Sequence, residues 1–574
     1  MSSCGLAAGA GAVFDFFRTK QGRKKKFELV SSGCAGFCGA EPLVAVTLSG
    51  KGEALYGPVD KKFAQSLIDS IKTGNFPKEN LLDQEHPFYR HQVRLVSRNL
   101  GVIDPKSIEE YIASGGYRAF LKTMFHLRSV DVIGEIEKSG LRGRGGAGFP
   151  TGRKWGITKH AGSAPRYIIM NGDEGDPGAY MDRSLMEGDP HAIIEGMLIG
   201  AYAMGAEMGI LYVRAEYPLA RARLESAVRE ARQHGLLGND ILDKGFDFDL
   251  HMVSGAGAFV SGEETALIHA VEGNIAEPDP RPPYPSEKGL YGRPTCINNV
   301  ETWANVPLII RNGAEEYRRF GTEKSKGTKL FCLVGDVART GLVEVPLGTP
   351  LSTIVKDIGG GAGGGLNVKA IQVGGPSGGC IPESAFDLPA DYESLQQAGT
   401  IMGSGGLVVM SQRNCMVDIA RYFLDFTKEE SCGKCTPCRE GTELLGAILD
   451  RITRGDGKED DLNQLEQISG NIMATSLCGL GQTAPNPVLT TLKHFRAEYE
   501  THVRERRCPA GVCTALLTFS IHEEKCTGCG LCVKECPAEA ISGSKKKPHR
   551  LDPATCVRCG ACRAVCPAGA VAAQ

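Results

Sequence analysis

Apolar residues between positions 165 and 310 follow two different spacings, and each spacing predicts a different element. The short apolar runs RYIIMN at 166–171 and ILYVRAEYP at 210–218 predict buried strands. Between them, PHAIIEGMLIGAYAMGAE at 190–207 is long enough to form a helix. Because strand–helix–strand alternation is typical of a parallel sheet flanked by helices, the sequence predicts an α/β domain.

The pattern changes beyond residue 327. TKLFCLVGDV (328–337) and VKAIQVGGPSGG (368–379) predict strands, and GGGAGGG (359–365) predicts a flexible loop. Helical spacing prevails after residue 403, as in ELLGAILDRI (443–452) and LNQLEQISGNI (462–472). We therefore expect a multidomain α/β chain of five parts, at residues 1–82, 83–327, 328–402, 403–516 and 517–574.

Charge and composition exclude several classes of protein. The 574 residues contain 65 Lys and Arg against 67 Asp and Glu, so no net positive charge favours a nucleic-acid partner. The basic run RTKQGRKKKF (18–27) is interpreted as a solvated hairpin tip or helix end. No apolar run reaches the ~20 residues of a membrane helix, and no apolar signal core precedes the first motifs. We expect a soluble cytoplasmic protein whose 21 cysteines are reduced, with the fifteen that fall in three tight groupings as metal ligands and most of the others as small core residues.

Two copies of C-x2-C-x2-C-x3-C-P stand in the last part, CTGCGLCVKECP (526–537) and CVRCGACRAVCP (556–567). In this pattern three thiolates hold one 4Fe-4S cluster, and the fourth crosses to the other cluster. Paired zinc knuckles, the alternative, would need no fourth Cys-Pro. The predicted ligands are Cys526, Cys529, Cys532 and Cys566 for the first cluster, and Cys536, Cys556, Cys559 and Cys562 for the second.

A third grouping, SCGKCTPCREGT (431–442), repeats the two-residue spacing. The nearest fourth thiolate follows two predicted helices, so it would return to the site from a helical hairpin. The set Cys432, Cys435, Cys438 and Cys478 predicts a further 4Fe-4S cluster, with zinc as the open alternative because four cysteines also suit a tetrahedral ion.

Two smaller sets of possible ligands remain. In RRCPAGVCTA, Cys508 and Cys513 follow His502, and with the distant thiolate of Cys415 they would hold zinc. Near the start of the chain, a thioredoxin-like 2Fe-2S domain would present four cysteines. Here only three are present, Cys4, Cys34 and Cys38, so we expect no cluster there.

The segment GLRGRGGAGFPTGRKW (140–155) combines bare backbone with positive charge. Glycine lets main-chain amides approach a phosphate, which Arg142, Arg144 and Lys154 would neutralise. A flexible surface turn is the alternative. The preceding SVDVIGEIEKSG has helical rather than strand spacing, so the site is not the usual Rossmann fingerprint. Its predicted apolar face contains Val130, Ile133 and Ile136.

Five motifs in this order resemble the NADH-oxidising flavoprotein subunit of respiratory complex I over residues 85–505. They are GRGGAGFPTGRKW, NGDEGDPGAYMDR, GAGAFVSGEETAL, INNVETWANVP and SCGKCTPCREGT. The added two-cluster tail and the N-terminal piece resemble more closely the beta subunit of NAD-linked, electron-bifurcating hydrogenases. The resemblance implies a thioredoxin-like N-terminal segment, a Rossmann-like FMN and NAD domain, a β-grasp module, a helical bundle with a 4Fe-4S cluster, and a two-cluster ferredoxin domain.

The resemblance also implies the cofactor site, at the loop ends of the parallel sheet. Its flavin pocket would contain Gly143, Arg144, Gly145, Gly146, Lys154, Asn171, Asp173, Gly262, Glu263, Asn298 and Asn299. The dinucleotide side would contain Phe149, Asp176, Glu264 and Tyr284, with Asp176 and Glu264 tuning binding and flavin electronics. Structural roles remain open: Asn298 and Asn299 would cap the next helix, and Glu263 and Glu264 would be first-turn acids.

Two positions depart from the family pattern. Asp176 stands where the complex I proteins typically carry glutamate, which favours the hydrogenase-like branch. Ile157 stands where an aromatic residue is common, which leaves the preference between NADH and NADPH open.

The implied reaction is hydride transfer between NAD(H) and FMN, followed by single-electron steps to the Cys432 cluster and outward. Implied partners are a large catalytic subunit of hydrogenase or formate dehydrogenase type, a small thioredoxin-like 2Fe-2S subunit, and ferredoxin. The same role in an NAD-dependent formate dehydrogenase or a ferredoxin–NADP transhydrogenase is the alternative. A non-catalytic iron–sulfur scaffold is the hypothesis of a different class.

Overall fold

The computed structural model describes residues 1–574 except 23–26, 83–84, 163 and 574. Its N-terminal segment contains α1 (Ser3–Ala7), α2 (Ala10–Gln21), the antiparallel pair β1 (Val44–Leu48) and β2 (Gly52–Tyr56), and α3 (Lys61–Thr73). Phe17, Tyr56 and Leu67 are buried between them. The basic run 18–27 begins at the end of α2, and its residues 23–26 lie outside the described residues. The thioredoxin-like character of this segment stays a prediction.

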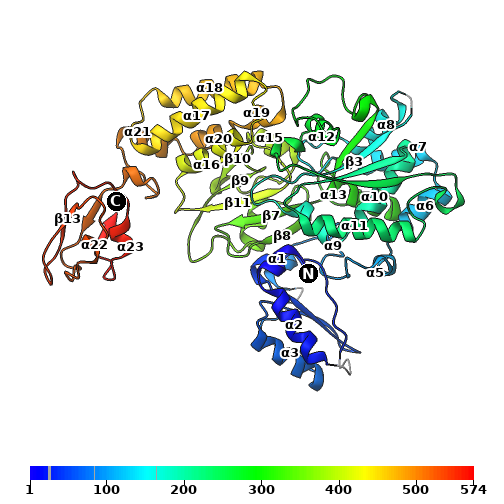
Figure 1. The fold of residues 1–574 in the computed structure, drawn as a ribbon, viewed down its shortest axis with the longest axis horizontal. Helices are drawn as coiled ribbons and strands as arrows, with labels where there is room; N and C mark the ends of the chain where they lie inside the picture. The colour runs from blue at the N-terminus through cyan, green and yellow to red at the C-terminus, as the bar shows by residue number, and fades with distance from the viewer. Residues whose placement is uncertain (23–26, 83–84, 163, 574) are drawn as a thin grey trace. The chain divides into compact units, whose positions relative to one another are not determined.

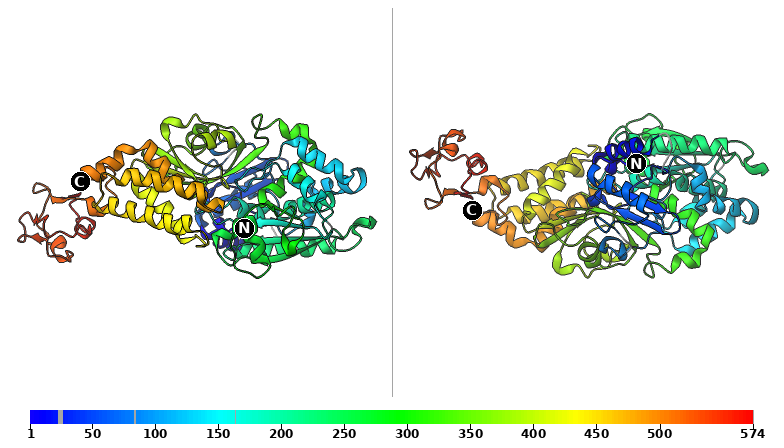
Figure 2. Two further views of the ribbon diagram at one scale, coloured as in Figure 1. Left: turned by 90° about the horizontal axis from the view of Figure 1, so that it is seen from above. Right: turned by 90° about the horizontal axis from the view of Figure 1, so that it is seen from below.

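A four-stranded parallel sheet forms the centre of the next part, as predicted (Figure 1). Its order is β5-β4-β3-β6, with bounds β3 (Tyr167–Gly172), β4 (Met208–Val213), β5 (Asp249–Ser254) and β6 (Thr295–Asn299). Alternate residues face opposite sides, so Ile168 packs with α10 (Pro190–Met204) and α13 (Val300–Asn312), whereas Ile169 packs with α12 (Glu264–Val271). Helices thus cover both faces (Figure 2).

The other helices of this part pack around the sheet, except the first, whose Phe88 is buried in the core of the next sheet. They are α4 (Pro87–Arg90), α5 (Ile108–Ala113), α6 (Arg118–His126), α7 (Ser129–Ser139), α8 (Thr151–His160), α9 (Met181–Gly188), α11 (Pro218–Gln233) and α14 (Ala314–Arg318). The predicted helix before the glycine-rich loop is α7, but one residue of its predicted apolar face is misplaced. Val130 is 49% exposed and Val132 is buried instead. The buried face of α7 therefore contains Val132 together with the predicted Ile133 and Ile136.

A second, five-stranded sheet follows, in the order β10-β9-β11-β7-β8. Its strands are β7 (Thr328–Gly335), β8 (Gly341–Pro346), β9 (Val368–Val373), β10 (Gly379–Pro382) and β11 (Gly406–Ser411), and α15 (Tyr392–Gln397) precedes the last of them. Because β11 pairs in parallel with β7, the predicted boundary at residue 402 lies before the sheet is complete. The loop 359–365 is held rather than flexible, since its backbone bonds to residues 336, 338 and 339.

The helical part has its own core, and with the residues that follow it, up to 574, it makes up the second of two compact units. Its helices are α16 (Met416–Glu429), α17 (Thr436–Arg454), α18 (Asp461–Thr475), α19 (Gly479–Thr483), α20 (Asn486–His494) and α21 (Arg496–Arg504). Leu445, Leu449 and Leu465 lie in that core, which confirms the predicted helical spacing.

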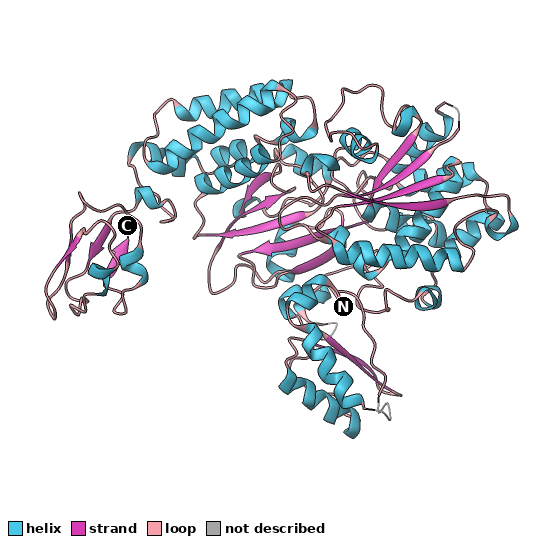
Figure 3. Cartoon of the chain, in the orientation of Figure 1, coloured by secondary structure: helices cyan, strands magenta, loops and turns pink. Residues whose placement is uncertain are grey.

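The chain ends in a small two-fold repeat. The strand pairs are β12 (Phe519–Ile521) with β15 (Val571–Ala573), and β13 (Ile541–Ser542) with β14 (Arg550–Leu551). Each half contributes one short helix, α22 (Leu531–Lys534) or α23 (Ala561–Ala564), as Figure 3 shows. Over the described ranges of the chain, no helix combines the length and apolarity needed to cross a bilayer.

Candidate functional site

The carboxyl ends of β3 and β6 bring several predicted residues to one edge of the parallel sheet. Asn171 and Asn299 are register partners there. The amide of Asn171 donates to the carbonyl of Gly262 at 2.9 Å, and Gly262 lies against Asp173. In parallel α/β sheets, ligands bind outside the carboxyl ends of the strands. The structure therefore assembles this part of the predicted flavin pocket at the expected edge.

The glycine-rich loop is closed by backbone bonds between α7 and α8. Gly143 N–H donates to the Phe149 carbonyl at 2.9 Å, and Gly146 and Gly148 adopt positive φ of 119° and 63°. The side chain of Arg142 donates to the carbonyl of Gly148 at 2.6 Å. The loop is thus ordered, which argues against the flexible-turn alternative.

Three consecutive amides of this loop remain available. Among the described residues, no acceptor bonds to the N–H groups of Gly145, Gly146 and Ala147. A run of backbone donors in such a loop forms a concave anion-binding surface. These amides fit the phosphate of FMN, whereas the carboxamides of Asn171, Asn298 and Asn299 already bond within the chain and shape the edge of the pocket.

Arg144 has a different role from the one predicted. Its side chain is fully buried, and its backbone amide donates to Thr302 Oγ1 at 2.9 Å. Its guanidinium donates to four protein acceptors, the carbonyls of Arg142, Lys326 and Thr328 and the hydroxyl of Tyr317. Because these acceptors occupy it, the guanidinium holds the loop in place rather than neutralising a phosphate.

Lys154 remains half-buried beside the loop. Its Nζ donates to Glu264 Oε1 at 2.6 Å and to the carbonyl of Ile297 at 3.0 Å. Burial lowers the pKa of Lys154, but the Glu264 carboxylate outweighs burial and the pKa lies above its ordinary value. Arg281, which sequence reasoning missed, lies 3.6 Å from the same carboxylate. Two cations, Lys154 and Arg281, thus lie against the carboxylates of Glu263 and Glu264.

Two predicted pocket residues cap helices: Asn299 in the role that the structural alternative gave it, and Glu263 at the N-cap where a first-turn acid was proposed. Glu263 accepts from the first amides of α12, at 2.9 and 3.0 Å. Asn299 accepts from the amide of Glu301 at the start of α13, and its Nδ2 donates to Asp182 at 2.5 Å. Asn298 is buried below it, and in the amide orientation that satisfies both of its ends its oxygen accepts from Trp155 Nε1 at 2.9 Å. Capping fixes these side chains at the edge of the pocket.

Asp176 is held by the second sheet's part of the chain. Ser404 Oγ donates to Asp176 Oδ2 at 2.6 Å. Burial raises the pKa of Asp176 to about 6, although the Ser404 bond opposes this shift. A side chain at Gly375 would collide with this carboxylate, with its Cβ 2.5 Å from Asp176 Cγ. Sequence reasoning missed Ser404 and Gly375, and their only signal was the glycine-rich surroundings of each.

Two aromatic side chains predicted for the dinucleotide side are exposed. Phe149 is 40% exposed, with the Arg153 guanidinium 5.7 Å from its ring centre. Tyr284 is 51% exposed, with the Arg281 guanidinium 6.0 Å from its ring centre. Exposed rings of this kind offer stacking faces to a planar ligand.

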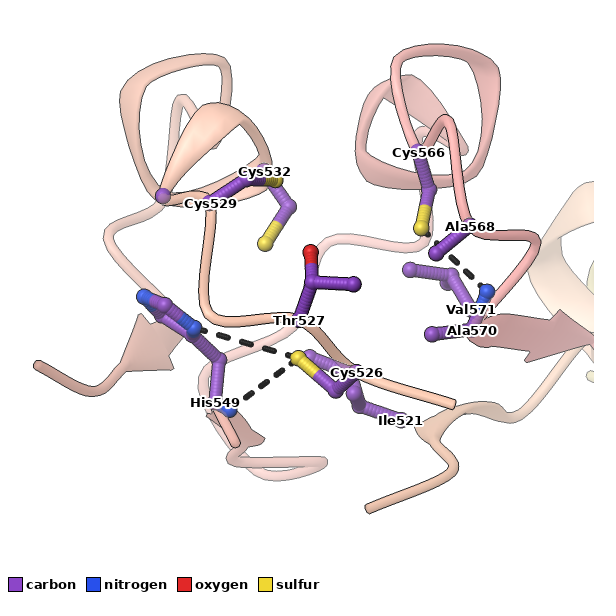
Figure 4. Close-up of a pocket in the computed structure, with 11 residues that line it drawn as sticks. Ile521, Cys526, Thr527, Cys529, Cys532, His549, Cys566, Ala568, Ala570 and Val571 are labelled. Carbon is purple, nitrogen blue, oxygen red and sulfur yellow. Dashed lines mark hydrogen bonds between the residues drawn. The ribbon is translucent and has the colours of Figure 1, made fainter. Parts of the chain in front are cut away.

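The C-terminal repeat contains a cysteine-lined hollow (Figure 4). Its thiol residues are Cys526, Cys529 and Cys532 from the first motif and Cys566 from the second. The predicted crossing of the fourth ligand is thus present in the fold, and the donor set fits a 4Fe-4S cluster. The other set follows the same arrangement in the second half, with Cys562 on α23 near Cys556 and Cys559.

The third grouping lies at the start of α17, in the second of the two units. Cys435 caps this helix, Cys438 lies in its first turn, and Cys438 Sγ is 3.3 Å from Ser431 Oγ. Gly481, three residues after Cys478, packs so closely that its Cβ would be 3.1 Å from that of Cys438. Helices α17 and α18 lie between these cysteines and Cys478 in the chain, as predicted, and the cluster itself stays a prediction.

The predicted zinc residues form one compact buried group. The ligand atoms of Cys415, His502, Cys508 and Cys513 all lie within 4.8 Å of one another. His502 Nε2 is 3.3 Å from Cys415 Sγ, and His502 Nδ1 bonds to the Glu498 carbonyl at 2.7 Å. That second bond orients the imidazole, as in many metal sites. Such closeness suits a single ion, whereas a cube of four irons holds its ligands farther apart.

The three N-terminal cysteines converge on the start of α9. Arg183 donates to Cys4 Sγ at 3.1 Å, and Cys38 Sγ is 3.5 Å from the Tyr180 hydroxyl. Hydrogen bonding with Cys38 lowers the pKa of the Cys4 thiol to about 7. Cys34 lies beside Cys38 in the same group. The set contains three thiols, and the absence of a cluster there stays a prediction.

Three family models match this chain in consecutive segments. Residues 136–308 match the Nuo51 FMN-binding domain. Residues 418–502 match the iron–sulfur binding region of NADH-ubiquinone oxidoreductase-F. Residues 519–572 match a 4Fe-4S dicluster domain. The fold and these segments define an FMN and iron–sulfur oxidoreductase subunit.

Individual relatives show the family. The chain is 54% identical over 460 residues, 80% of its length and 94% of the relative's, to NADP-reducing hydrogenase subunit HndC of Solidesulfovibrio fructosivorans. It is 45% identical to an F-type subunit of the NADH-quinone oxidoreductase of Rhizobium meliloti, over 72% of its own length and 98% of the relative's. A crystal structure of air-oxidized NAD+-reducing [NiFe]-hydrogenase matches at a TM-score of 0.63 and 30% identity, covering 88% of this chain and 84% of that one. The chain belongs to the family of NADH-binding complex I and hydrogenase flavoprotein subunits.

Proposed function

We propose that this chain is the flavin-carrying component of an electron-bifurcating hydrogenase complex of the cytoplasm. It exchanges a hydride between NAD(H) and FMN and passes single electrons through three 4Fe-4S clusters, with NAD and ferredoxin as the two acceptors. The hydrogenase relatives and the two-cluster tail support this proposal over the complex I role. An NAD-dependent formate dehydrogenase or a ferredoxin–NADP transhydrogenase would use the same site.

One observation carries the proposal: the amides of Gly145, Gly146 and Ala147 bond to no acceptor among the described residues, in a loop that also carries the exposed Phe149 and leads into α8 with Lys154. The amides bind the flavin phosphate, and the Lys154–Glu264 pair fixes the charge beside it. Phe149 and Tyr284 supply stacking faces for the dinucleotide. Bound FMN supplies the change from a two-electron hydride to single electrons.

Asp176 positions the dinucleotide side. Its carboxyl is fixed by Ser404, so it presents one orientation to a ligand. Burial raises its pKa to about 6, with smaller opposing contributions from the Ser404 bond and Arg214 and a further increase from Glu174, so it ionises close to physiological pH. No proton transfer by a side chain is needed for hydride exchange, so its role is to bind and to set the local field.

The buried tetrad of Cys415, His502, Cys508 and Cys513 is proposed to hold one zinc ion. Three thiolates with one imidazole match the ligands of structural zinc sites. The cysteines of this tetrad lie in the core of the helical bundle. A bound ion would therefore stabilise the bundle and the segment that follows it, up to residue 517.

An exposed lysine loop is proposed to receive an acidic electron carrier. Lys545, Lys546 and Lys547 are exposed, and the amide of Lys546 donates to the Gly528 carbonyl of the first cysteine motif at 3.0 Å. Positive charge held beside a cluster site accelerates encounter with a negatively charged partner. Ferredoxin is the carrier that we propose.

The complex isolated anaerobically through a tag on this chain tests the function. With hydrogen as donor, we expect NAD+ reduction only when oxidised ferredoxin is also present. If NAD+ is reduced without ferredoxin, electrons follow a single linear path and the bifurcation proposal is wrong. Reduction with formate instead of hydrogen would select the formate dehydrogenase type, and the same assay with NADP+ tests the nicotinamide preference. A complex that contains iron, binds no FMN and does not reduce dyes with NADH would support the alternative of a non-catalytic iron–sulfur scaffold.

A further inference from the structure

A buried histidine lies beside the cysteine hollow of the C-terminal repeat. His549 is 3% exposed, lines the hollow, and directly precedes β14. Its backbone N–H donates to Cys526 Sγ at 3.4 Å, and its ring Nδ1 is 3.9 Å from the same sulfur (Figure 4). The same residue therefore reaches one predicted ligand sulfur through both its backbone and its ring.

The position of this ring is fixed by packing. A side chain at Gly543 would place its Cβ 2.5 Å from His549 Cδ2, so glycine at 543 leaves just enough room for the imidazole. On the other side, the amide of Lys546 ties the same segment to the Gly528 carbonyl. The imidazole is consequently held against Cys526 rather than free to turn toward solvent.

The two halves of the repeat differ at this point. In the first set, Cys526 accepts from the amide of His549 and Cys566 from that of Ala570. In the second set, Cys536 accepts from the amide of Ala540 and Cys556 from that of Arg558. Across the described part of residues 517–574, the imidazole of His549 is the one side chain bonded to a cysteine sulfur. The backbone donors are matched, and the ring is the asymmetric feature.

We propose that His549 raises the reduction potential of the first C-terminal cluster by donating a hydrogen bond from Nδ1 to Cys526 Sγ. One-electron reduction makes and breaks no bond and adds one negative charge to the cluster and its sulfurs. A donor to a ligand sulfur stabilises that charge, so reduction becomes more favourable. His549 is a positioning and tuning residue, and it separates the potentials of two otherwise similar sites.

This inference rests on the proposed function only in requiring that the C-terminal cysteines hold clusters. Iron content and the EPR signals of the reduced full-length chain test that requirement separately. A chain without these signals would contradict the cluster assignment. A chain with both signals and unchanged potentials in the variants below would contradict the role of His549 alone.

The decisive experiment is an EPR-monitored redox titration of the full chain with three variants. His549→Phe removes the donor and keeps a ring, His549→Gln restores a donor, and Thr527→Val alters the same hollow at a side chain without a bond to cysteine sulfur. In His549→Phe we expect one signal to be about tenfold less reduced at a fixed potential, equivalent to about 59 mV. The second signal stays unchanged, His549→Gln recovers part of the loss, and Thr527→Val matches the parent chain. Equal potentials in all four proteins would overturn the proposal.

A second measurement uses the unmodified sequence, in case the phenylalanine variant loses iron. The chain is labelled with 15N only in histidine rings, and the reduced clusters are probed by pulsed EPR. We expect a 15N coupling on one of the two C-terminal clusters, from the ring bonded to Cys526. Absence of that coupling on both reduced clusters would overturn the proposal, whatever the variants show.

Discussion

Ser404 donates a 2.6 Å hydrogen bond to Asp176, and so joins the loop before β11 to the loop after β3. The two residues are separated by 228 positions in the chain. The part of the chain that forms the five-stranded sheet therefore contributes a residue to the candidate dinucleotide site.

This bond predicts a pH dependence. Burial raises the pKa of Asp176 to about 6, above its ordinary value, and the Ser404 bond lowers it. Ser404→Ala should move the pKa further upward, so the acid limb of NADH-dependent dye reduction shifts to higher pH, and Asp176→Asn should abolish that limb. The raised pKa also makes folding stability depend on pH, because the folded chain favours the protonated carboxyl. This stabilisation is fully present below the ordinary pKa of aspartate and is lost as pH rises through about 6.

The matched control is Ser384→Ala, since Ser384 is an exposed serine of the same part of the chain. Its pH profile should coincide with that of the parent. An acid limb that stays in place in Ser404→Ala would show that this ionisation does not govern the reaction.

Flavin retention should depend on Gly145. A Cβ at this position would lie 3.2 Å from the Asn299 Cβ, and a branched side chain would cover the open amides. We expect Gly145→Val to lose most bound FMN while iron content stays near that of the parent. Gly134→Val is the control, because nothing lies within 4 Å of a Cβ there. FMN retained in full by Gly145→Val, measured by fluorescence after denaturation, would place the phosphate elsewhere.

The sequence predicted what depends on local pattern. Strands β3 and β4, helix α10 and the cysteine spacings are local signals, and the fold confirms the elements. The role of Arg144 was wrong because its acceptors at residues 317–328 lie far along the chain, where no periodicity reveals them. Ser404 was missed for the same reason, since a lone serine among glycines gains meaning only when β11 places it near Asp176.

Boundaries and loops followed tertiary contacts instead. The apolar run of β11 was placed in the helical part, although it pairs with β7 inside the five-stranded sheet. GGGAGGG predicted flexibility from composition, yet Asp336 and Ala338 bond to its backbone. Composition indicates how flexible an isolated segment would be. The neighbours that restrict the segment become known only from the fold.

The lysine loop predicts a salt-dependent rate. Replacing Lys545, Lys546 and Lys547 by Gln should slow reduction of an acidic ferredoxin by about tenfold at low ionic strength and flatten its salt dependence, because steering acts before contact. The rate of NADH-dependent dye reduction should not change. Lys61, Lys62 and Lys106, exposed elsewhere, form the control triple. Equal salt slopes for the two triples would exclude this loop as the docking surface.

A buried ion pair below the flavin site predicts a stability difference. Lys329 and Glu301 are 0% and 1% exposed and are directly bonded, and burial raises the pKa of Glu301 despite Lys329. Lys329→Met leaves an uncompensated buried carboxylate and should cost about 3–5 kcal/mol in unfolding free energy. Lys356→Met breaks an exposed pair with Glu383, 47% and 46% exposed, and should cost no more than about 1 kcal/mol. Equal losses in denaturant unfolding would contradict the argument from burial.

The buried tetrad predicts a metal that is not iron. Cys513→Ser should remove about one zinc per chain and leave iron and FMN unchanged, because Cys513 Sγ lies 3.4 Å from His502 Nε2 and 3.7 Å from Cys415 Sγ. The helical bundle should then unfold at lower temperature, since metal binding contributes to folding. Cys380→Ala, a buried cysteine of β10, is the control and should keep the zinc. Metal analysis of both variants decides the matter, and a parent chain without zinc, or a Cys513→Ser chain that keeps it, would contradict this prediction.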